Sequence, residues 1–491
     1  MPNDTPTRNT GDELHARSKS PAFTPVPRVK PGADGRSGVL PGTPHTKEPD
    51  PELGNDIIDQ RRYTSPEFMR LEWERLWTKV WLVAGRELDM PDPGDYIATE
   101  VGAESIMAVR QADGSVRAFY NVCQHRGNRL RPCGRGSAGT SQSFKCLYHH
   151  WEYNLDGSYR RIPDVDTFEQ GAPPYGLTEV KCEVWGSFVW FSMDPDAQPL
   201  AEYLAPIPQH LDPYHFERMV QTRDITVEWD CNWKASVDAV NESYHVQGIH
   251  PQLLWYLHDL DIQIDCYGRH NRYLIPFGTL SPRVRKPNTI PDSIKSIMKA
   301  AGMDTVDYDE PIANIRRDVQ KHKRATGAQL GKDYSELNDD QLTDDYHYTI
   351  FPNLSLNLHA DDFWVFRQRP HATDPNKMYY DIWTYELVPQ GQEWPKRAKH
   401  QTWKHGEKSI GLVLDQDAAN LPNVQAGMHS RGFRGLWLGR QELRIRHFHK
   451  VIDDYLFARG ADASGADASG GVSDGLAPGS GSDAWKTRGS T

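Results

Sequence analysis

Four potential metal ligands in one stretch of the chain constrain its fold more than any other feature. Residues 121–151 read NVCQHRGNRLRPCGRGSAGTSQSFKCLYHHW and contain a Cys-x-His pair, Cys123 and His125, and a Cys-x-x-His pair, Cys146 and His149. The residues between the pairs are rich in Gly, Ser and Arg, which is typical of a loop. Each pair therefore belongs to its own loop, and folding the loops together would gather four ligands.

Two thiolates and two imidazoles are the ligand set of a [2Fe–2S] cluster in which Cys holds one iron and His holds the other. Each loop supplies one residue of each kind, so both irons can be reached. Neutral imidazoles leave the cluster less negative than four thiolates would, and this raises its reduction potential. The alternative is a structural zinc site, which also accepts two Cys and two His. The first pair favours the cluster, because zinc ribbons use Cys-x-x-Cys instead.

A second group of possible ligands lies in residues 229–251, WDCNWKASVDAVNESYHVQGIHP. Asp238, Glu242 and His245 stand at i, i+4 and i+7, which predicts that they share one face of a helix. His250 follows five residues after His245, and nearby Gly and Pro indicate a bend that would return its ring toward His245. Two such imidazoles and one carboxylate form the facial triad of non-haem Fe(II) oxygenases. Taken alone, the two histidines would also suit a structural role.

The two groups together, in this order, resemble the Rieske ring-hydroxylating oxygenases, and the chain is identified as the large (alpha) subunit of such an enzyme. In that family the second cluster loop often reads C-x-Y-H-G-W; here it is Cys146-Leu147-Tyr148-His149-His150-Trp151, with His150 in place of the usual Gly. The family's catalytic domain carries an acid-x-Y-H-x4-H segment, which matches Glu242-Ser243-Tyr244-His245 followed by His250. The resemblance covers residues 60 to 457.

The resemblance implies a third ligand of the mononuclear iron, an Asp that precedes a Q-x-G motif. Asp417 takes the matching place before Gln425-Ala426-Gly427, and Asp415 is the competing choice. It also implies that Glu242, where many members have Asp, hydrogen-bonds between a cluster His of one subunit and His245 of the next. The alternative is that Glu242 only orients His245 within its own chain.

In such an enzyme the cluster takes single electrons from a ferredoxin or a flavoprotein reductase and passes them to Fe(II), which activates O2. NAD(P)H would serve only through that separate reductase, because the chain has no G-x-G-x-x-G motif after a strand. The resemblance further implies a homotrimer, or a hetero-oligomer with a small beta subunit. The expected substrate is small and apolar, with aromatic dihydroxylation favoured over monooxygenation and oxidative demethylation.

Two sets of residues are candidates for binding the substrate and the redox partner. Four aromatic residues near plausible pocket segments are candidates for the substrate pocket, although such residues are more often core: Trp255, Tyr256, Phe351 and Phe363. Four arginines around the first cluster loop could form a docking face for an acidic ferredoxin, or simply a solvated face: Arg126, Arg129, Arg131 and Arg135.

Length and composition limit the remaining choices. At 491 residues the chain is too long for one ordinary core. A net charge of −11 without a long basic run argues against nucleic acid as a partner. The six cysteines show no disulfide pattern, and we find neither an apolar run of about 18 residues nor a signal-like segment. We therefore expect a cytoplasmic protein with no membrane partner.

The expected fold is α+β, with a small all-β Rieske [2Fe–2S] domain followed by an α+β helix-grip catalytic domain, an antiparallel sheet with helices. Ser65-Pro66-Glu67 predicts the start of a helix before the first domain. A charged insertion predicts surface helices, either a cap over the active site or a solvated addition. The predicted parts are a disordered tail at 1–54, a helical segment at 55–79, the Rieske domain at 80–199, the catalytic domain at 200–459 with its insertion at 292–345, and a disordered tail at 460–491.

Two alternatives of a different class follow from the same residues. An electron carrier would have the cluster but no working mononuclear site, and a zinc-stabilised binding protein would have neither. Iron content and colour separate the three hypotheses.

Overall fold

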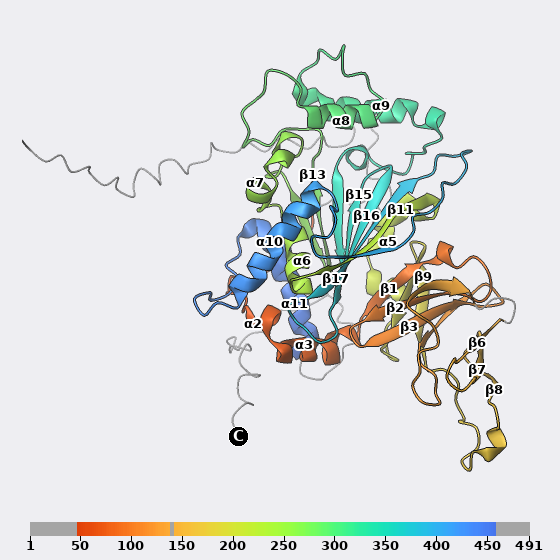
Figure 1. The fold of residues 1–491 in the computed structure, drawn as a ribbon. Helices are drawn as coiled ribbons and strands as arrows, with labels where there is room; N and C mark the ends of the chain where they lie inside the picture. Colours follow the sequence, from red (N-terminus) through yellow and green to blue (C-terminus); the bar gives the residue numbers. More distant parts are fainter. Residues whose placement is uncertain (1–46, 138–141, 458–491) are drawn as a thin grey trace, which may run out of the picture. The chain divides into compact units, whose positions relative to one another are not determined.

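The computed structural model describes residues 47–137 and 142–457 (Figure 1). The two predicted disordered tails lie outside the described residues except for residues 47–54. There, the backbone N–H of Glu48 donates to Asp265 Oδ1 over 2.7 Å. No helix in the described part of the chain is long and apolar enough to cross a membrane.

The first domain is built only of strands and short turns of helix, as predicted. Seven strands form one sheet in the order β1-β10-β9-β4-β3-β2-β5, and β6-β7-β8 form a second, smaller sheet. The ligand loops connect β4 to β5 and β6 to β7. The strands are β1 Trp81–Arg86, β2 Asp95–Val101, β3 Glu104–Arg110, β4 Val116–Tyr120, β5 Gly134–Ser137, β6 Ser143–Lys145, β7 Glu152–Asn154, β8 Tyr159–Arg161, β9 Glu179–Trp185 and β10 Phe188–Ser192.

The second domain contains one eight-stranded sheet in the order β12-β13-β14-β15-β16-β17-β11-β18. Neighbouring strands are antiparallel as expected, except that the edge strand β18 runs parallel to β11. The strands are β11 Met219–Trp229, β12 Gln263–Tyr267, β13 His270–Ile275, β14 Asp345–Ile350, β15 Leu354–Leu358, β16 Asp362–Pro370, β17 Met378–Leu387 and β18 Gln401–Lys404.

Helices α6, α10 and α11 lie together against this sheet (Figure 1). At the N-terminus, Ser65 caps α3 as predicted, because its Oγ accepts the N–H of Phe68 over 3.1 Å. The helices are α2 Arg61–Thr64, α3 Pro66–Glu72, α4 Leu200–Leu204, α5 Ile207–Leu211, α6 Trp233–Val240, α7 Val246–Ile249, α8 Asp292–Ala300, α9 Ile315–Thr326, α10 Leu412–Met428 and α11 Leu443–Phe457.

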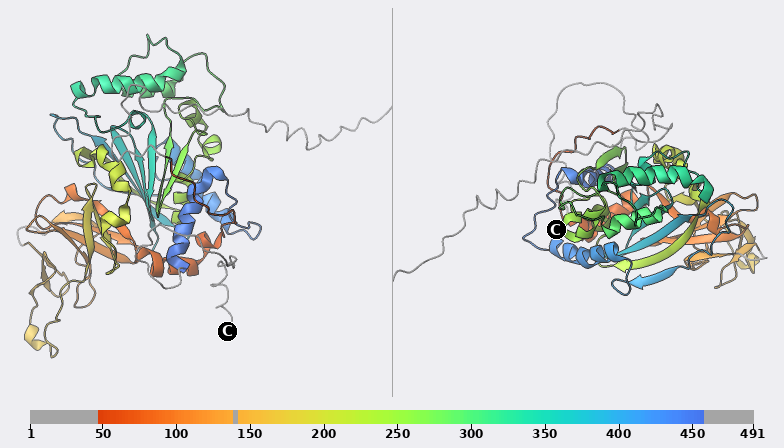
Figure 2. Two further views of the ribbon diagram at one scale, coloured as in Figure 1. Left: turned by 180° about the vertical axis from the view of Figure 1, so that it is seen from behind. Right: turned by 90° about the horizontal axis from the view of Figure 1, so that it is seen from above.

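The charged insertion contains α8 and α9, which lie across one end of the eight-stranded sheet in all the views (Figures 1 and 2). The two helices share a small apolar cluster of Ile294, Met298, Ile315 and Val319, and Tyr256 packs against it. The insertion therefore contacts the chain six residues after His250.

Two arginines held by a buried carboxylate hydrogen-bond across to the first domain. Asp381 of β17 accepts from both Arg367 and Arg369 of β16, over 2.6 and 2.7 Å. These arginines also donate to backbone carbonyls of the first domain, Arg367 to Val83 and Arg369 to Glu100. One continuous apolar core runs through both domains, so the β-domain is fixed against the sheet rather than tethered by a linker.

Candidate metal centres

The structure brings the four predicted cluster ligands together. The rings of His125 and His149 lie 4.5 Å apart between centroids, and the side chains of Cys123 and Cys146 are buried. Tight turns shape both loops. In the first, Gly127 N–H donates to Cys123 O over 3.0 Å, and in the second, the N–H of Cys146 donates to the carbonyl of the Trp151 residue over 2.8 Å.

The electrostatics of these side chains suit a cluster. Burial raises the pKa of the Cys123 thiol, and the neighbouring Cys146 adds to this, so an unpaired thiolate there is unfavourable without a metal. Burial, followed by the charge of His149, lowers the pKa of His125, which keeps its imidazole neutral. His125 Nδ1 is buried and has no hydrogen-bond partner among the described residues. A metal ion is the partner that such a nitrogen lacks.

Sequence reasoning missed two neighbours of the cluster. The indole of Trp151 stacks on His125, with centroids 4.8 Å apart and planes 7° from parallel. Tyr153 lies with its hydroxyl 3.2 Å from Cys123 Sγ and accepts the N–H of Gln124 over 3.0 Å, which leaves the phenolic O–H free to donate to sulfur. Hydrogen bonds to the sulfur atoms raise the potential of such clusters. No sequence spacing pointed to Tyr153.

His150 adopts a backbone conformation that favours glycine. Its φ is 60°, in the left-handed region where residues with a Cβ are strained. The side chain is exposed, so no packing contact accounts for a histidine there. The turn after His149 requires left-handed backbone. This requirement explains both the φ of His150 and the glycine that is usual at this position.

The prediction of one helical face for Asp238, Glu242 and His245 is wrong. Helix α6 ends at Val240 and is capped by Asn241, so Glu242 and His245 lie beyond it. Asn241 Oδ1 accepts from Thr349 Oγ1 of β14 over 2.5 Å, and this tertiary contact holds the helix end against the sheet. The break frees the following residues to turn inward.

The bend predicted before His250 is confirmed, and it assembles a triad. His250 follows the single turn α7 with non-helical backbone, and its ring lies 5.0 Å from that of His245 between centroids. Asp417 of α10 comes within 3.0 Å of His250 Nε2 through its Oδ1. One potential ligand atom from each of these three residues lies within 4.8 Å of the other two.

Asp415, the competing acid, is used elsewhere. It lies in the first turn of α10, where Oδ1 accepts the N–H of Ile410 over 2.8 Å and Oδ2 accepts from Ser409 Oγ over 2.5 Å. The helix therefore turns Asp415 toward the loop before it, and turns Asp417 toward the histidines.

Both histidines are oriented through Nδ1, so each can present Nε2 to a metal. Glu242 Oε1 lies 2.5 Å from His245 Nδ1, and its Oε2 accepts the backbone N–H of His245 over 3.0 Å. Burial opposes a charge on His245, but the hydrogen bond and charge of Glu242 outweigh it and raise the pKa of His245. Gln416 Oε1 holds His250 Nδ1 over 2.8 Å. Sequence reasoning missed Gln416, although it adjoins Asp417. Such partners fix the tautomer and ring orientation of metal-binding histidines.

Two of the four candidate pocket aromatics belong to the core instead. Phe351 packs against Tyr455 and Phe448 of α11, and Phe363 stacks on Phe216 and Tyr385. Trp255 is exposed. Tyr256 alone remains beside the triad segment, with its ring edge-on to Phe277 at 5.4 Å.

Models of two protein families match the chain. The family described as "Rieske [2Fe-2S] domain" matches residues 80–180, and the family described as "Ring hydroxylating alpha subunit (catalytic domain)" matches residues 216–458. The chain belongs to the Rieske oxygenase alpha subunits. It therefore uses a Rieske [2Fe–2S] cluster and a mononuclear iron, and the two groups of residues described above fit these cofactors.

The relatives of this alpha subunit differ in chemistry. The glycine betaine monooxygenase oxygenase subunit of Pseudomonas aeruginosa is 30% identical over 201 residues, which cover 40% of this chain and 45% of that protein. The match thus spans less than half of that relative. The biphenyl dioxygenase subunit alpha of Paraburkholderia xenovorans is 26% identical over 411 residues, 77% of this chain and 81% of that protein.

Solved structures of the family share the fold. A quaternary ammonium Rieske monooxygenase superimposes with a TM-score of 0.61 at 20% identity, covering 84% of this chain and 99% of that one. Naphthalene 1,2-dioxygenase superimposes with a TM-score of 0.59 at 19% identity, covering 83% and 93%. At these identities the likeness establishes the fold and leaves the substrate open.

The left-handed backbone at His150 predicts different outcomes for three substitutions. His150→Gly and His150→Asn should keep the cluster, because both residues tolerate this conformation. His150→Val should destabilise the loop by about 1 kcal/mol, because left-handed backbone costs a β-branched residue more than it costs a histidine. The measurement is loss of cluster absorbance on heating, and a valine variant that loses its cluster no earlier than wild type would contradict the argument.

The Glu242–His245 contact predicts that Glu242→Gln keeps the cluster spectrum but lowers turnover about 10- to 100-fold, the effect of removing an outer partner of a metal-binding histidine. Gln247→Ala, which changes an exposed neighbour in α7, is the matched control. Normal product formation by Glu242→Gln would exclude both the orienting and the bridging interpretation of Glu242.

Proposed function

We propose that this chain is the terminal oxygenase component of a multi-protein system that hydroxylates a small substrate with O2. The supporting observation is that His245, His250 and Asp417 converge in the same chain that gathers Cys123, His125, Cys146 and His149. When bound, the cluster supplies one-electron transfer and the mononuclear iron supplies O2 activation. The cluster would sit on the four Cys and His side chains, and Fe(II) on the triad. A ferredoxin or flavoprotein reductase would deliver the electrons, with NAD(P)H as their indirect source.

Exposed apolar side chains beside both centres support assembly with a second copy of the chain, as a homotrimer or together with a small beta subunit. Leu147 and Tyr148 on the cluster loop are 81% and 54% exposed, and Tyr244 beside Glu242 is 53% exposed. A contact between these two surfaces would cover all three side chains. It would also bring a cluster histidine of one subunit toward Glu242 of the next, as the bridging role of Glu242 requires.

The four arginines around the first cluster loop give only weak support to a docking face for ferredoxin, because two of them are engaged within the chain. Arg129 forms an ion pair with Glu100, and Arg131 donates to the carbonyl of Leu130 and lies over Phe144. The side chain of Arg135 lies outside the described residues. Arg126 is exposed and lies over Tyr148, 5.1 Å from the ring centroid. Because the proposed contact between subunits would cover Tyr148, Arg126 would belong to that contact, and these arginines give ferredoxin docking little support.

For the substrate, our first candidate remains a small aromatic compound that is dihydroxylated. Support comes from the long match to the biphenyl dioxygenase subunit and from the aromatic rings of Tyr256 and Phe277 next to the triad segment. The apolar cluster that includes Val246, Leu254 and Tyr273 extends this surface along β13. Flat apolar rings suit such a wall.

A second candidate is a polar substrate that undergoes monooxygenation or demethylation, and the polar groups of β14 and β15 support it. Arg444 Nη2 lies 2.9 Å from His347 Nδ1, so the ring proton must be on Nε2, since an arginine can only donate. Burial holds the pKa of His347 well below its ordinary value, and its Nε2 has no partner among the described residues. Asn357, paired with His347 across the strands, has an equally unpaired Nδ2.

The unpaired donors of His347 and Asn357 bear on the choice between an apolar and a polar substrate, because a hydrocarbon cannot accept a hydrogen bond from them. A substrate with a carboxylate, carbonyl or hydroxyl oxygen could accept from one or both, and a buried donor without an acceptor is costly. The glycine betaine monooxygenase subunit among the relatives agrees with this candidate.

Metal content tests the oxygenase proposal itself. We expect a brown protein with about three irons per chain, two in the cluster and one in the triad, and a Rieske-type EPR signal after dithionite reduction. About two irons per chain, unchanged when Asp417 is replaced by Ala, would indicate an electron carrier. A colourless protein with one zinc would overturn both readings.

Isotope labelling separates the two substrate candidates. With 18O2 and a surrogate ferredoxin system, aromatic dihydroxylation places two labelled atoms in a diol. Monooxygenation places one in the product, and demethylation of a methylammonium group releases formaldehyde. Biphenyl, salicylate and glycine betaine form a suitable first panel of substrates.

If the polar candidate is right, His347→Phe should lower turnover of the polar substrate by about tenfold or more, the effect of losing a hydrogen bond in a polar site.

A further inference from the structure

Gln425, the glutamine of the Q-x-G motif, has no role in the site as described so far. It lies on α10, the helix that carries Asp417, and its side chain is buried with 3% of its surface exposed. Its oxygen accepts the backbone N–H of Asn232 over 2.9 Å. Its nitrogen donates to the carbonyl of Tyr63 over 3.2 Å and to Asn376 Oδ1 over 2.8 Å. All these contacts are buried or partly buried.

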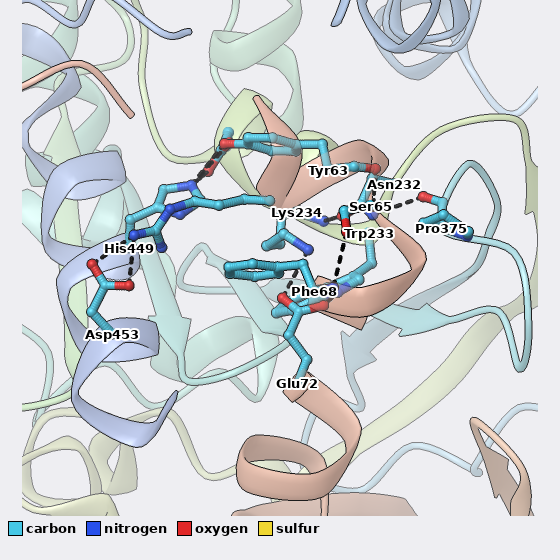
Figure 3. A network of polar contacts seen from close by, with 12 residues as sticks. Tyr63, Ser65, Phe68, Glu72, Asn232, Trp233, Lys234, Pro375, His449 and Asp453 are labelled. Atoms are coloured by element: carbon cyan, nitrogen blue, oxygen red, sulfur yellow. Dashed lines mark hydrogen bonds and ion pairs between the residues drawn. The ribbon is translucent and has the colours of Figure 1, made fainter. Parts of the chain in front are cut away.

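Asn232 is the N-cap of α6, the helix that leads to His245 and His250. Its Oδ1 accepts the N–H of Lys234 over 3.0 Å, and its Nδ2 donates to the carbonyls of Tyr63 and Pro375 over 3.0 and 2.7 Å (Figure 3). The carbonyl of Tyr63 therefore receives one donor from the start of α6 and another from α10. Gln425 and Asn232 are also bonded directly to each other.

Further buried contacts fix α6 along its length. Lys234 pairs with Glu72 of α3 over 2.8 Å, with both side chains almost fully buried. One turn later, Asp238 accepts from the hydroxyl of Tyr63, which lies 2.7 Å from His449 Nε2 of α11 (Figure 3). With α6 held in this way, the contacts of Gln425 join α10 to the start of that helix.

We propose that Gln425 is a positioning residue for the mononuclear iron. It holds α10 at the spacing from α6 that places Asp417 opposite His245 and His250. Its described side-chain hydrogen bonds go to Asn232, Tyr63 and Asn376 rather than to any of the three ligands. This inference rests on the proposed function, since it assumes that the triad binds iron.

The chemistry of the position explains why an amide is needed. A backbone N–H on Asn232 and a carbonyl on Tyr63 require one acceptor and one donor from a single side chain, and Gln supplies both. An apolar residue of similar length would fill the same volume but leave the Asn232 N–H buried without an acceptor. The helices would then move apart to admit water to these groups.

The test compares iron binding in full-length variants. Gln425→Met keeps the length of the side chain and removes its hydrogen bonds, while Gln425→Glu keeps an acceptor for Asn232 and loses the donor to Tyr63. Asn423→Ala is the matched control, because Asn423 is an exposed amide on the same helix that bonds only to Ala419 O. Fe(II) affinity is measured by competition with a chelator, and the geometry of the site by EPR of its nitric oxide adduct. The cluster spectrum is the internal reference for folding.

We expect Gln425→Met to bind Fe(II) about tenfold or more weakly, as other outer contacts of metal sites do when removed, and to show an altered nitric oxide signal. Gln425→Glu should fall between it and wild type. If Gln425→Met does not fold, Gln425→Glu alone decides. Wild-type affinity and signal in the folded variants would overturn the inference, even if they melt earlier, because Gln425 would then be an ordinary core residue. If wild type itself binds no iron at the triad, the proposed function fails and this inference with it.

Discussion

The three residues of the triad come from two segments that are 167 residues apart in the sequence, and most of the second domain serves to close that distance. One segment follows α6, and the other lies on α10. Helix α6 packs against β16 of the eight-stranded sheet, α10 packs against α6, and buried hydrogen bonds join the two helices at the start of α6. The cluster ligands need no such arrangement, because two neighbouring loops supply all four. Local turns therefore hold the cluster ligands together, whereas long-range packing holds the iron ligands together.

That difference also explains what the sequence could predict. Cys123, His125, Cys146 and His149 lie in short motifs whose spacing encodes their chemistry, and the bend that returns His250 to His245 could be predicted from Gly and Pro. The end of α6 at Asn241 could not, because it depends on a hydrogen bond to Thr349 on a distant strand. Helical periodicity alone continued the helix through Glu242.

The same limit applies to the surroundings of the site. Asp417 was found only through the resemblance to a family, since nothing in its local sequence separates it from Asp415. Gln416 and Tyr153 act on ligands that the fold brings to them, so their roles are invisible in a linear pattern. For the aromatic residues, the sequence suggested a role in the pocket that the fold does not give them. Phe351 and Phe363 look like pocket residues until the packing assigns them to the core.

The eight-stranded sheet ends on one side in β18, a strand of four residues of which three are exposed, running parallel to its neighbour. Short, polar edge strands are poor templates for pairing with another chain, and proteins use them to avoid aggregation. The contact proposed between copies of this subunit would therefore use side chains and loops rather than this edge of the sheet. In that assembly, the distance over which an electron travels between subunits would be set by a surface that substitution can adjust gradually, without any change to the hydrogen-bonded framework of the fold.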